Sequence, residues 1–134
     1  MSSCIVCSIS NRLLESHIIY ESESVICFLD HRPISEGHVL LCPKKHYPNI
    51  MDLPNEILFE IFSLAKKMAL FLQGKFKCDG VSLLQNNGLF NDLGHFHLHL
   101  FPRFNGDGFY WNSPNDEVFS LDKLAHTKKI FIDF

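Results

Sequence analysis

The longest regular alternation of apolar and polar side chains in this chain has a helical period and follows Pro54. If this segment forms a helix, its apolar side chains lie on one side, and glutamate, serine and lysine side chains lie on the other. Asp52 is suited to the N-cap, Pro54 to the first turn and Gly74 to the end of the helix. The pattern therefore predicts one long amphipathic helix with an apolar stripe on a core. That stripe consists of Ile57, Ile61, Leu64, Ala65, Met68 and Leu72.

Short β-rich runs lie on both sides of this helix. They cover residues 17–20, 25–29, 39–42, 81–85 and 95–101. The links between the first three are short and polar, which favours antiparallel pairing. Three strands, a helix and two strands predict an α+β fold: a single domain over residues 1–134, with a mostly antiparallel five-stranded sheet, one long helix and short additional helical turns. We expect residues 106–114 to form a loop and the last twenty residues to form a short helix or a tail.

Composition narrows the class of protein. The chain has 134 residues, of which 46% are hydrophobic and 13% aromatic, and a formal net charge of −3. Such a chain buries a core and is not disordered, and without a basic excess it is not expected to bind nucleic acid. No apolar stretch approaches the roughly 18 residues of a membrane helix. An odd number of cysteines and no basic, apolar leader indicate a reduced, cytoplasmic protein that does not engage a membrane.

A run of alternating histidines, residues 95–101, carries the candidate chemistry. In a strand, His95, His97 and His99 lie on one face, and the intervening apolar residues lie on the other. Successive imidazoles would then be about 6.5–7 Å apart. Because several histidines on one face need polar partners, that face is expected to meet solvent, a metal or a ligand.

Three interpretations of the histidine face remain open from the residues alone. The histidines could line a polar surface, or two or three of them could bind a catalytic zinc ion. They could also act on a phosphate, with a neutral imidazole attacking phosphorus while protonated neighbours donate hydrogen bonds to its oxygens.

The sequence resembles the histidine triad (HIT) superfamily of nucleotide hydrolases and transferases in three ordered blocks. The first is the strand, Pro-containing loop, Gly-His and strand in residues 28–46, which ends in Pro43-Lys44-Lys45-His46. The second is Gln85-Asn86-Asn87-Gly88, and the third is the histidine run followed by Pro102-Arg103. The resemblance implies a HIT-like fold and a homodimer whose sheets join.

The resemblance also implies roles for individual residues. His97 would be the nucleophile that forms a covalent nucleotidyl-histidine intermediate, which water then hydrolyses. His99 would contact the phosphate or the leaving group, and His38 would complete the cluster from a neighbouring strand. Asp30 would accept hydrogen bonds from the ribose hydroxyls, and Asn86 would reach the ribose or the phosphate.

One window departs from the family pattern. Where the family usually has Gly-Gln-Ser/Thr-Val before the histidines, this chain has Phe90-Asn91-Asp92-Leu93-Gly94. Asn91 can imitate the amide that binds phosphate or leaving group, whereas Asp92 brings a negative charge. We expect both in the substrate site. For Asp92 three possibilities stay open: it could turn outward, cap the loop, or accept a proton from a leaving group, so the departure leaves the leaving-group preference and the rate open.

The implied reaction is hydrolysis at the α-phosphate of an adenosine-type nucleotide without an organic cofactor. Dinucleoside polyphosphates are slightly favoured over nucleoside phosphoramidates as substrates. Two alternatives remain: a non-enzymatic nucleotide-binding or scaffold module, and a zinc-dependent hydrolase with the metal on the triad.

Cys4-x-x-Cys7 forms a second candidate site. Two thiolates at this spacing can bind zinc, although a redox pair or two buried thiols would look the same. Some HIT proteins with this motif are zinc-bound, with partners that match His46 and His95. The resemblance therefore implies a structural zinc on Cys4, Cys7, His46 and His95.

Overall fold

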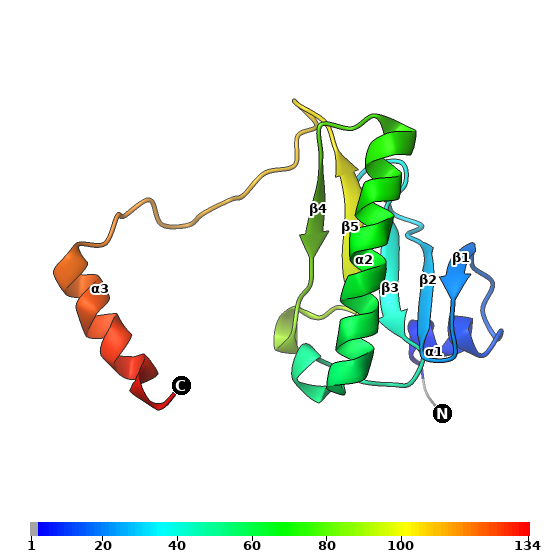
Figure 1. The fold of residues 1–134 in the computed structure, drawn as a ribbon, viewed down its shortest axis with the longest axis horizontal. Coiled ribbons are helices and arrows are strands. Elements are labelled where there is room, and N and C mark those ends of the chain that lie inside the picture. The colour runs from blue at the N-terminus through cyan, green and yellow to red at the C-terminus, as the bar shows by residue number, and fades with distance from the viewer. Residues whose placement is uncertain (1–2) are drawn as a thin grey trace.

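The computed structural model describes residues 3–134, in which five antiparallel strands form one sheet in the order β1-β2-β3-β5-β4. One long helix covers a face of that sheet (Figure 1). This confirms the predicted α+β fold. The strands are β1 Ile18–Glu21, β2 Val25–Leu29, β3 Val39–Pro43, β4 Gly80–Leu84 and β5 Leu98–Arg103.

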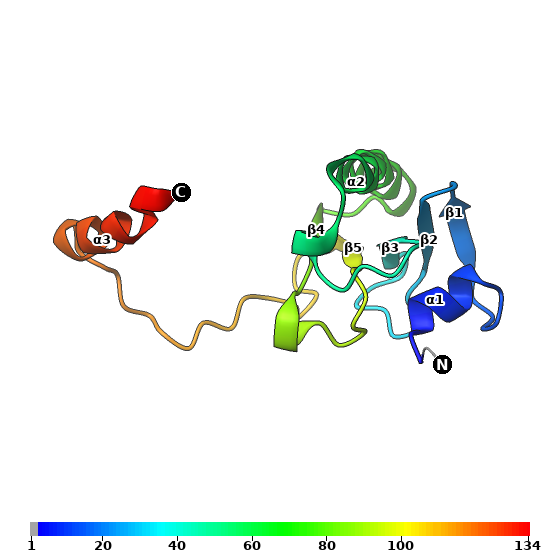
Figure 2. The same ribbon diagram turned by 90° about the horizontal axis from the view of Figure 1, so that it is seen from below.

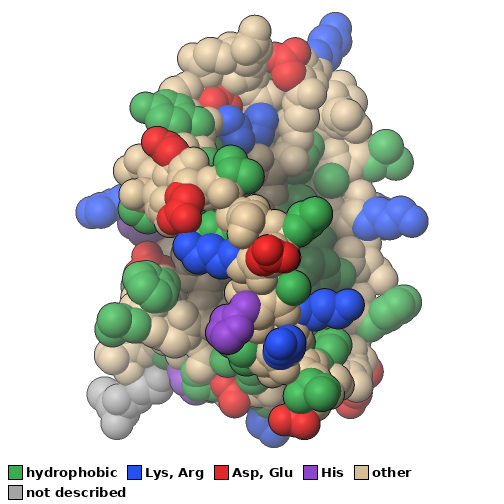
Figure 3. Space-filling view, turned by 90° about the vertical axis from the view of Figure 1, so that its left-hand side faces the viewer, with side chains coloured by type: hydrophobic (Ala, Val, Ile, Leu, Met, Phe, Trp, Pro, Cys, Tyr) green, Lys and Arg blue, Asp and Glu red, His purple; other side chains and the backbone are tan. Residues whose placement is uncertain are grey.

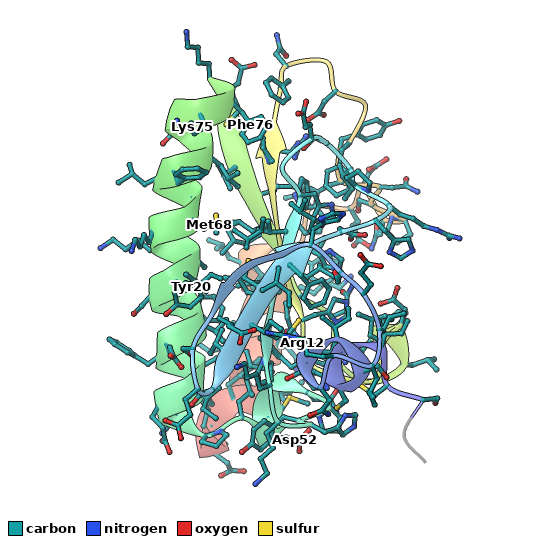
Figure 4. All side chains as sticks on the ribbon, turned by 90° about the vertical axis from the view of Figure 1, so that its right-hand side faces the viewer. Arg12, Tyr20, Asp52, Met68, Lys75 and Phe76 are labelled. Carbon is teal, nitrogen blue, oxygen red and sulfur yellow. The ribbon has the colours of Figure 1, made fainter. Side chains whose placement is uncertain are left out.

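The long helix is α2, Asn55–Phe76, and its predicted apolar stripe is confirmed: Ile61, Ala65, Met68 and Leu72 are buried. Figure 4 shows Met68 and Phe76 on the side of α2 that lies against the sheet. The side chains at this contact are apolar and closely packed, so the helix is held mainly by burial rather than by its intrinsic propensity.

Both predicted ends of this helix were wrong. Asp52 does not cap α2, because its carboxylate accepts a hydrogen bond from the Asn49 N–H and so belongs to the preceding 3₁₀ turn, Ile50–Asp52. Pro54 is the N-cap residue itself. The helix also continues through Gly74 to Phe76, whose ring packs on the core, and ends at Lys77 in the left-handed conformation.

A short helix that the sequence pattern did not reveal, α1 Ile5–Ser10, lies across the other face of the sheet (Figure 2). Alternate residues of β2 and β3 therefore enter two different clusters. Val25 and Val39 pack on the α2 side, whereas Ile26 and Leu40 pack on the α1 side. Burial on both faces explains why these strands are continuously apolar instead of alternating.

The strand that carries the histidines begins later than predicted, at Leu98 instead of residue 95. The N–H of Phe96 donates to the carbonyl of Tyr47 at 2.7 Å, so the residues before Leu98 are bound to a loop and not to the ladder. Side chains nevertheless alternate between the two faces as predicted, because Phe96 and Leu98 both pack in the core between the sheet and α2. β1 and β4 are each shifted by one residue from the prediction, β3 ends one residue later, and β5 ends two residues later. Residues 106–114 contain neither helix nor strand, as expected.

The C-terminal segment leaves the sheet as an extended arm that ends in α3, Leu121–Lys128, and a 3₁₀ turn, Lys129–Asp133 (Figures 1 and 2). A short helix was one of the two expectations for this segment. Seen from the side of the arm, lysine and arginine side chains are interspersed with acidic and hydrophobic ones (Figure 3). Within residues 3–134, no helix combines the length and apolarity needed to cross a membrane.

Candidate active site

A cavity of about 830 Å³ opens on the α1 side of the sheet. Its walls come from α1, from the segment between α1 and β1, from the β2–β3 region and from the loop before β5. His97 and His99 lie in its lining together with His38, Asp30 and Asp92. The structure thus brings five of the seven predicted catalytic and substrate-binding residues to one cavity.

His38 enters this cavity from the tight loop before β3. Gly37 precedes it with φ +95°, and a Cβ at Gly37 would come within 2.9 Å of the Phe76 ring. Only glycine tolerates that combination of a positive φ and a close neighbour. Gly37 therefore lets the loop pass over the end of α2 and sets His38 at the start of the strand, where its side chain is buried.

Backbone contacts fix which nitrogen of His38 carries a proton. The N–H of Ile34 donates to Nδ1 of His38 at 3.0 Å, so Nδ1 accepts and the proton of the neutral ring lies on Nε2. Nε2 of His38 lies 2.9 Å from Nδ1 of His99. It therefore donates to His99, whose own proton then lies on Nε2. A single backbone donor in this way sets the tautomers of two rings.

His97 is held in the opposite tautomer. Its Nδ1 lies 2.9 Å from the carbonyl oxygen of His95 and must donate to it. The lone pair of the neutral ring is therefore on Nε2, the nitrogen beside the Asp92 carboxylate at 3.3 Å. The rings of His97 and His99 are 4.8 Å apart at their centroids. The cavity thus contains a nucleophilic nitrogen on one ring and an N–H donor on its neighbour.

Burial keeps the supporting rings neutral. It lowers the pKa of His99 to about 4, and the nearby His97 and His38 rings contribute in the same direction. Burial also lowers the pKa of His38, although the Asp30 carboxylate opposes this. Near neutral pH, His38 and His99 therefore keep the tautomers that the hydrogen bonds impose.

Asp30 follows β2 and is close to both of these rings. Its Oδ2 lies 3.5 Å from Nε2 of His38 and 3.9 Å from Nδ1 of His99, and its Oδ1 accepts the N–H of Arg32 at 2.8 Å. Oδ1 thus accepts a hydrogen bond from the loop backbone, while Oδ2 lies at the cavity beside the two histidines. Its predicted role toward ribose stays a prediction.

The two predicted asparagines are placed differently. The amide of Asn91 donates to the carbonyl of Pro48 at 2.7 Å, and its oxygen accepts from the N–H groups of Leu93 and Gly94. Asn86 is not in the cavity lining. Contacts from Asn91 and Asn86 to a substrate stay predictions. Asn91 visibly shapes the loop that carries Asp92.

The four predicted metal ligands form one cluster. The ligand atoms of Cys4, Cys7, His46 and His95 all lie within 4.8 Å of one another. Recorded separations run from 3.1 Å between the two Nδ1 atoms to 3.6 Å between Cys7 Sγ and His95 Nδ1. A tetrahedral zinc site with bonds of about 2.0–2.3 Å has edges of roughly 3.3–3.8 Å, so these residues can hold a metal ion.

The chemistry of the donors fits a cation as well. Nε2 of His95 is 2.8 Å from the carbonyl of Pro43, which places its proton there and leaves the Nδ1 lone pair for the cluster. Burial and the neighbouring Cys4 thiol raise the pKa of Cys7 to about 11. The Cys7 thiolate is therefore favoured here when a cation compensates its charge.

The cluster is also connected to the nucleophile. The carbonyl of His95 accepts the hydrogen bond that orients His97, while the ring of the same residue lies among the metal donors. A metal on this cluster would therefore hold the backbone that sets the His97 tautomer. All four positions of a tetrahedral ion would be taken by protein, which is typical of structural sites.

Asp30, His38 and His99 form a second group with ligand-like spacing. This group is poorly suited to a metal. Nε2 of His38 would have to coordinate the ion, yet the Ile34 N–H occupies Nδ1 and places the ring proton on Nε2. This disfavours a metal on Asp30, His38 and His99, whereas the alternative of a hydrolase with zinc on the triad itself stays a prediction.

Sequence reasoning missed the backbone groups that organise the site. The N–H of Ile34 and the carbonyls of Pro43 and His95 set the ring tautomers, but a carbonyl or an N–H is present in nearly every residue and gives no compositional signal. It also missed that Ile5 and Ile9 of α1 line the cavity, because the helix was not predicted.

Known proteins match this chain over most of its length. The family described as "HIT domain" matches residues 11–106. The adenosine 5'-monophosphoramidase of Saccharomyces cerevisiae is 35% identical over 131 residues, which cover 96% of this chain and 80% of the yeast protein.

Solved structures share the fold. A crystal structure of a member of the HIT family from Bacillus subtilis has a TM-score of 0.85 at 28% identity, covering 98% of this chain and 96% of the bacterial one. A Zn-bound histidine triad family protein from Mycobacterium smegmatis has a TM-score of 0.75 at 32% identity, covering 84% of each chain.

Proposed function

This chain belongs to the HIT domain family, and from that premise we propose that it is a nucleoside phosphoramidase. The proposed enzyme breaks the P–N bond at the α-phosphate of an adenosine-type phosphoramidate and releases the nucleoside monophosphate. The sequence alone slightly favours dinucleoside polyphosphates as substrates. The phosphoramidase activity named for the yeast relative, together with a carboxylate beside the nucleophile, favours the phosphoramidate.

The observation that carries the proposal is the paired arrangement of tautomers. His97 donates from Nδ1 to a backbone carbonyl and keeps a lone pair on Nε2, whereas His99 accepts on Nδ1 and keeps a proton on Nε2. Both residues line the same cavity. A nucleophile and a hydrogen-bond donor on adjacent rings suit displacement at phosphorus, where one group attacks and the other supports the leaving atom.

The proposed mechanism has two displacements. The bridging nitrogen takes up a proton, Nε2 of His97 forms a bond to phosphorus, and the amine leaves with the electron pair of the P–N bond. Water then attacks the nucleotidyl-His97 phosphorus, the ring recovers its electron pair, and one proton is released. His99 donates from Nε2 to the reacting groups, and His38 keeps His99 in the required tautomer.

The residues that line the same cavity suggest how the substrate binds. We propose that Asp30, which lines the cavity, accepts hydrogen bonds from the ribose hydroxyls. The apolar wall formed by Ile5, Ile9 and Leu40 would contact the nucleobase. The adenosine preference rests on the yeast relative.

We further propose that the cluster of Cys4, Cys7, His46 and His95 binds a structural zinc ion. The donor set and spacing support this, as does the Zn-bound protein from Mycobacterium smegmatis. The ion would tie α1 to the segment before β5 and would take no part in the chemistry.

We propose a homodimer on the strength of two exposed features. β4 is an edge strand, and the neighbouring α2 exposes Phe59, Phe62, Leu70 and Phe71. Pairing of two β4 edges with burial of these side chains would satisfy both features.

The function is tested by turnover. Purified protein is incubated with an adenosine 5'-N-alkylphosphoramidate, and the released nucleoside monophosphate is measured for the wild type and for His97→Ala. We expect turnover by the wild type and loss of at least about a thousandfold in the variant. Binding of nucleotide without turnover by the wild type would favour the non-enzymatic binding module instead.

A further inference from the structure

Asp92 is unusually placed for a residue beside a phosphate-transfer nucleophile. Its Oδ1 lies 3.3 Å from Nε2 of His97, and its side chain is 82% exposed. Within residues 3–134, it is the only carboxylate recorded within ion-pair distance of that ring. A phosphate that approaches Nε2 must therefore approach a negative charge.

Hydrogen bonds of the Asn91 side chain fix the loop backbone around Asp92. The carbonyl oxygen of the Asn91 side chain accepts from the N–H groups of Leu93 and Gly94, on the far side of Asp92 in the sequence, and the Asn91 amide donates to Pro48. Gly94 follows with φ +63°. These contacts hold the backbone on both sides of Asp92, whose side chain lies in the cavity lining.

Geometry places the leaving group in the field of this carboxylate. Reacting atoms meet at about 3–3.5 Å, and the leaving atom lies in line beyond phosphorus, about 5 Å from Nε2. Because Oδ1 lies 3.3 Å from Nε2, an approach at about a right angle to the Nε2···Oδ1 direction brings the leaving atom to about 6 Å from Oδ1. That distance is shorter than the Debye length of about 8–10 Å in physiological salt, and the interaction is only partly screened.

We propose that Asp92 determines leaving-group selectivity, favouring amines over polyphosphates; this rests on the phosphoramidase function proposed above. When a P–N bond breaks, the protonated bridging nitrogen carries positive charge and departs as a neutral amine with the bonding electron pair. When a P–O–P bond breaks, the electron pair leaves on oxygen and the departing polyphosphate gains negative charge. The Asp92 carboxylate attracts the first and repels the second.

An effect of Asp92 on the leaving group can be measured separately from its effect on His97. The ring becomes cationic as Nε2 bonds to phosphorus, and a neighbouring carboxylate stabilises that charge for every substrate. This contribution is common to both reactions and cancels in a ratio of kcat/KM values. The ratio for two leaving groups therefore reports only the interaction that distinguishes them.

The test compares kcat/KM for an adenosine 5'-N-propylphosphoramidate with that for diadenosine tetraphosphate. The variant Asp92→Asn removes the charge and keeps the shape of the side chain. The control Glu36→Gln removes an exposed carboxylate two residues from His38 that is not in the cavity lining. His97→Ala identifies turnover that does not depend on the nucleophile.

We expect Asp92→Asn to lower the phosphoramidate-to-tetraphosphate ratio by about tenfold, equivalent to about 1.4 kcal/mol, and Glu36→Gln to keep it within about twofold of wild type. A fall of less than about threefold, or a rise, overturns the role of Asp92 while His97-dependent phosphoramidate turnover still supports the proposed function. If the wild type hydrolyses neither substrate, both proposals are overturned.

Salt supplies a second readout. Because the Asp92 side chain is largely exposed, added NaCl should lower the wild-type ratio and leave the Asp92→Asn ratio nearly constant. A wild-type ratio that is independent of salt contradicts an electrostatic origin.

Discussion

His38 donates from Nε2 to Nδ1 of His99 across 2.9 Å, because the Ile34 N–H already occupies the other nitrogen of His38. His38 lies in the loop just before β3 and His99 lies in β5, 61 residues apart in the sequence. Their hydrogen bond transmits the influence of a loop backbone to the ring beside the nucleophile. The chemistry of the site thus depends on proton positions that the fold dictates.

Ring tautomers can be observed directly. Two-dimensional ¹H–¹⁵N spectra of the imidazoles near neutral pH should show the proton on Nε2 of His38 and His99 and on Nδ1 of His97, as their hydrogen bonds require. Ile34→Pro removes the N–H donor and should allow His38 to populate both tautomers. A proton on Nε2 of His97 in the neutral ring would contradict the assignment of the nucleophile.

The depressed pKa of His99 has a consequence for stability. Folding lowers this pKa to about 4 from its ordinary 6.5, so between these values the unfolded chain binds a proton that the folded protein does not. The contribution of neutral His99 is therefore present above pH 6.5 and is lost as the pH falls toward 4.

Urea unfolding at several pH values checks this effect. His99→Asn should flatten part of the fall in unfolding free energy between pH 6.5 and about 4, while His126→Gln, on the exposed helix α3, should keep the wild-type curve. An NMR titration that places the His99 pKa near 6.5 would refute the argument.

Metal removal should affect stability more than chemistry. Chelation, or the variant Cys4→Ser, should lower Tm by on the order of 10 °C, because the proposed ion joins α1 to the segment before β5. The control Cys78→Ser changes a thiol outside the cluster. His97→Ala should retain one zinc per chain by metal analysis. Zinc lost from His97→Ala and retained in Cys4→Ser would place the metal on the triad instead.

The proposed dimer predicts a change in mass. Phe59 is 76% exposed on α2, and Phe59→Asp should convert a wild-type dimer to a monomer in light scattering because a charge would be buried at the interface. Leu13 is 81% exposed beyond α1, and Leu13→Asp should leave the dimer intact. A wild type of monomer mass, or a Phe59→Asp variant of dimer mass, would contradict this interface.

The fold could be predicted from the sequence where the period of apolar residues is unambiguous. The stripe through Ile61, Met68 and Leu72 predicted α2. The histidine run predicted a strand that is present but starts only at Leu98. The HIT-like fold is confirmed by the structural neighbours. Helix α1 was missed because six residues are too few to display a helical period. The ends of α2 were wrong because the sequence does not show that Asp52 bonds backward or that Phe76 reaches the core.

The site could be predicted only as a set of side chains. Alternation placed His97 and His99 on one face, and the structure brings them together with His38, Asp30 and Asp92. Which nitrogen of each ring is free depends on backbone groups of Ile34 and His95 that meet these rings only after folding. A sequence pattern therefore indicated which residues react but not which atoms.

The most direct test is to trap the intermediate on the protein. Wild-type enzyme is mixed with an adenosine 5'-phosphoramidate, quenched rapidly without acid, and analysed by intact mass and peptide mapping. We expect a nucleoside monophosphate group bonded to the ring of His97, absent in His97→Ala and present in Asn86→Ala. Undiminished turnover in His97→Ala, or an adduct on another residue, would contradict it.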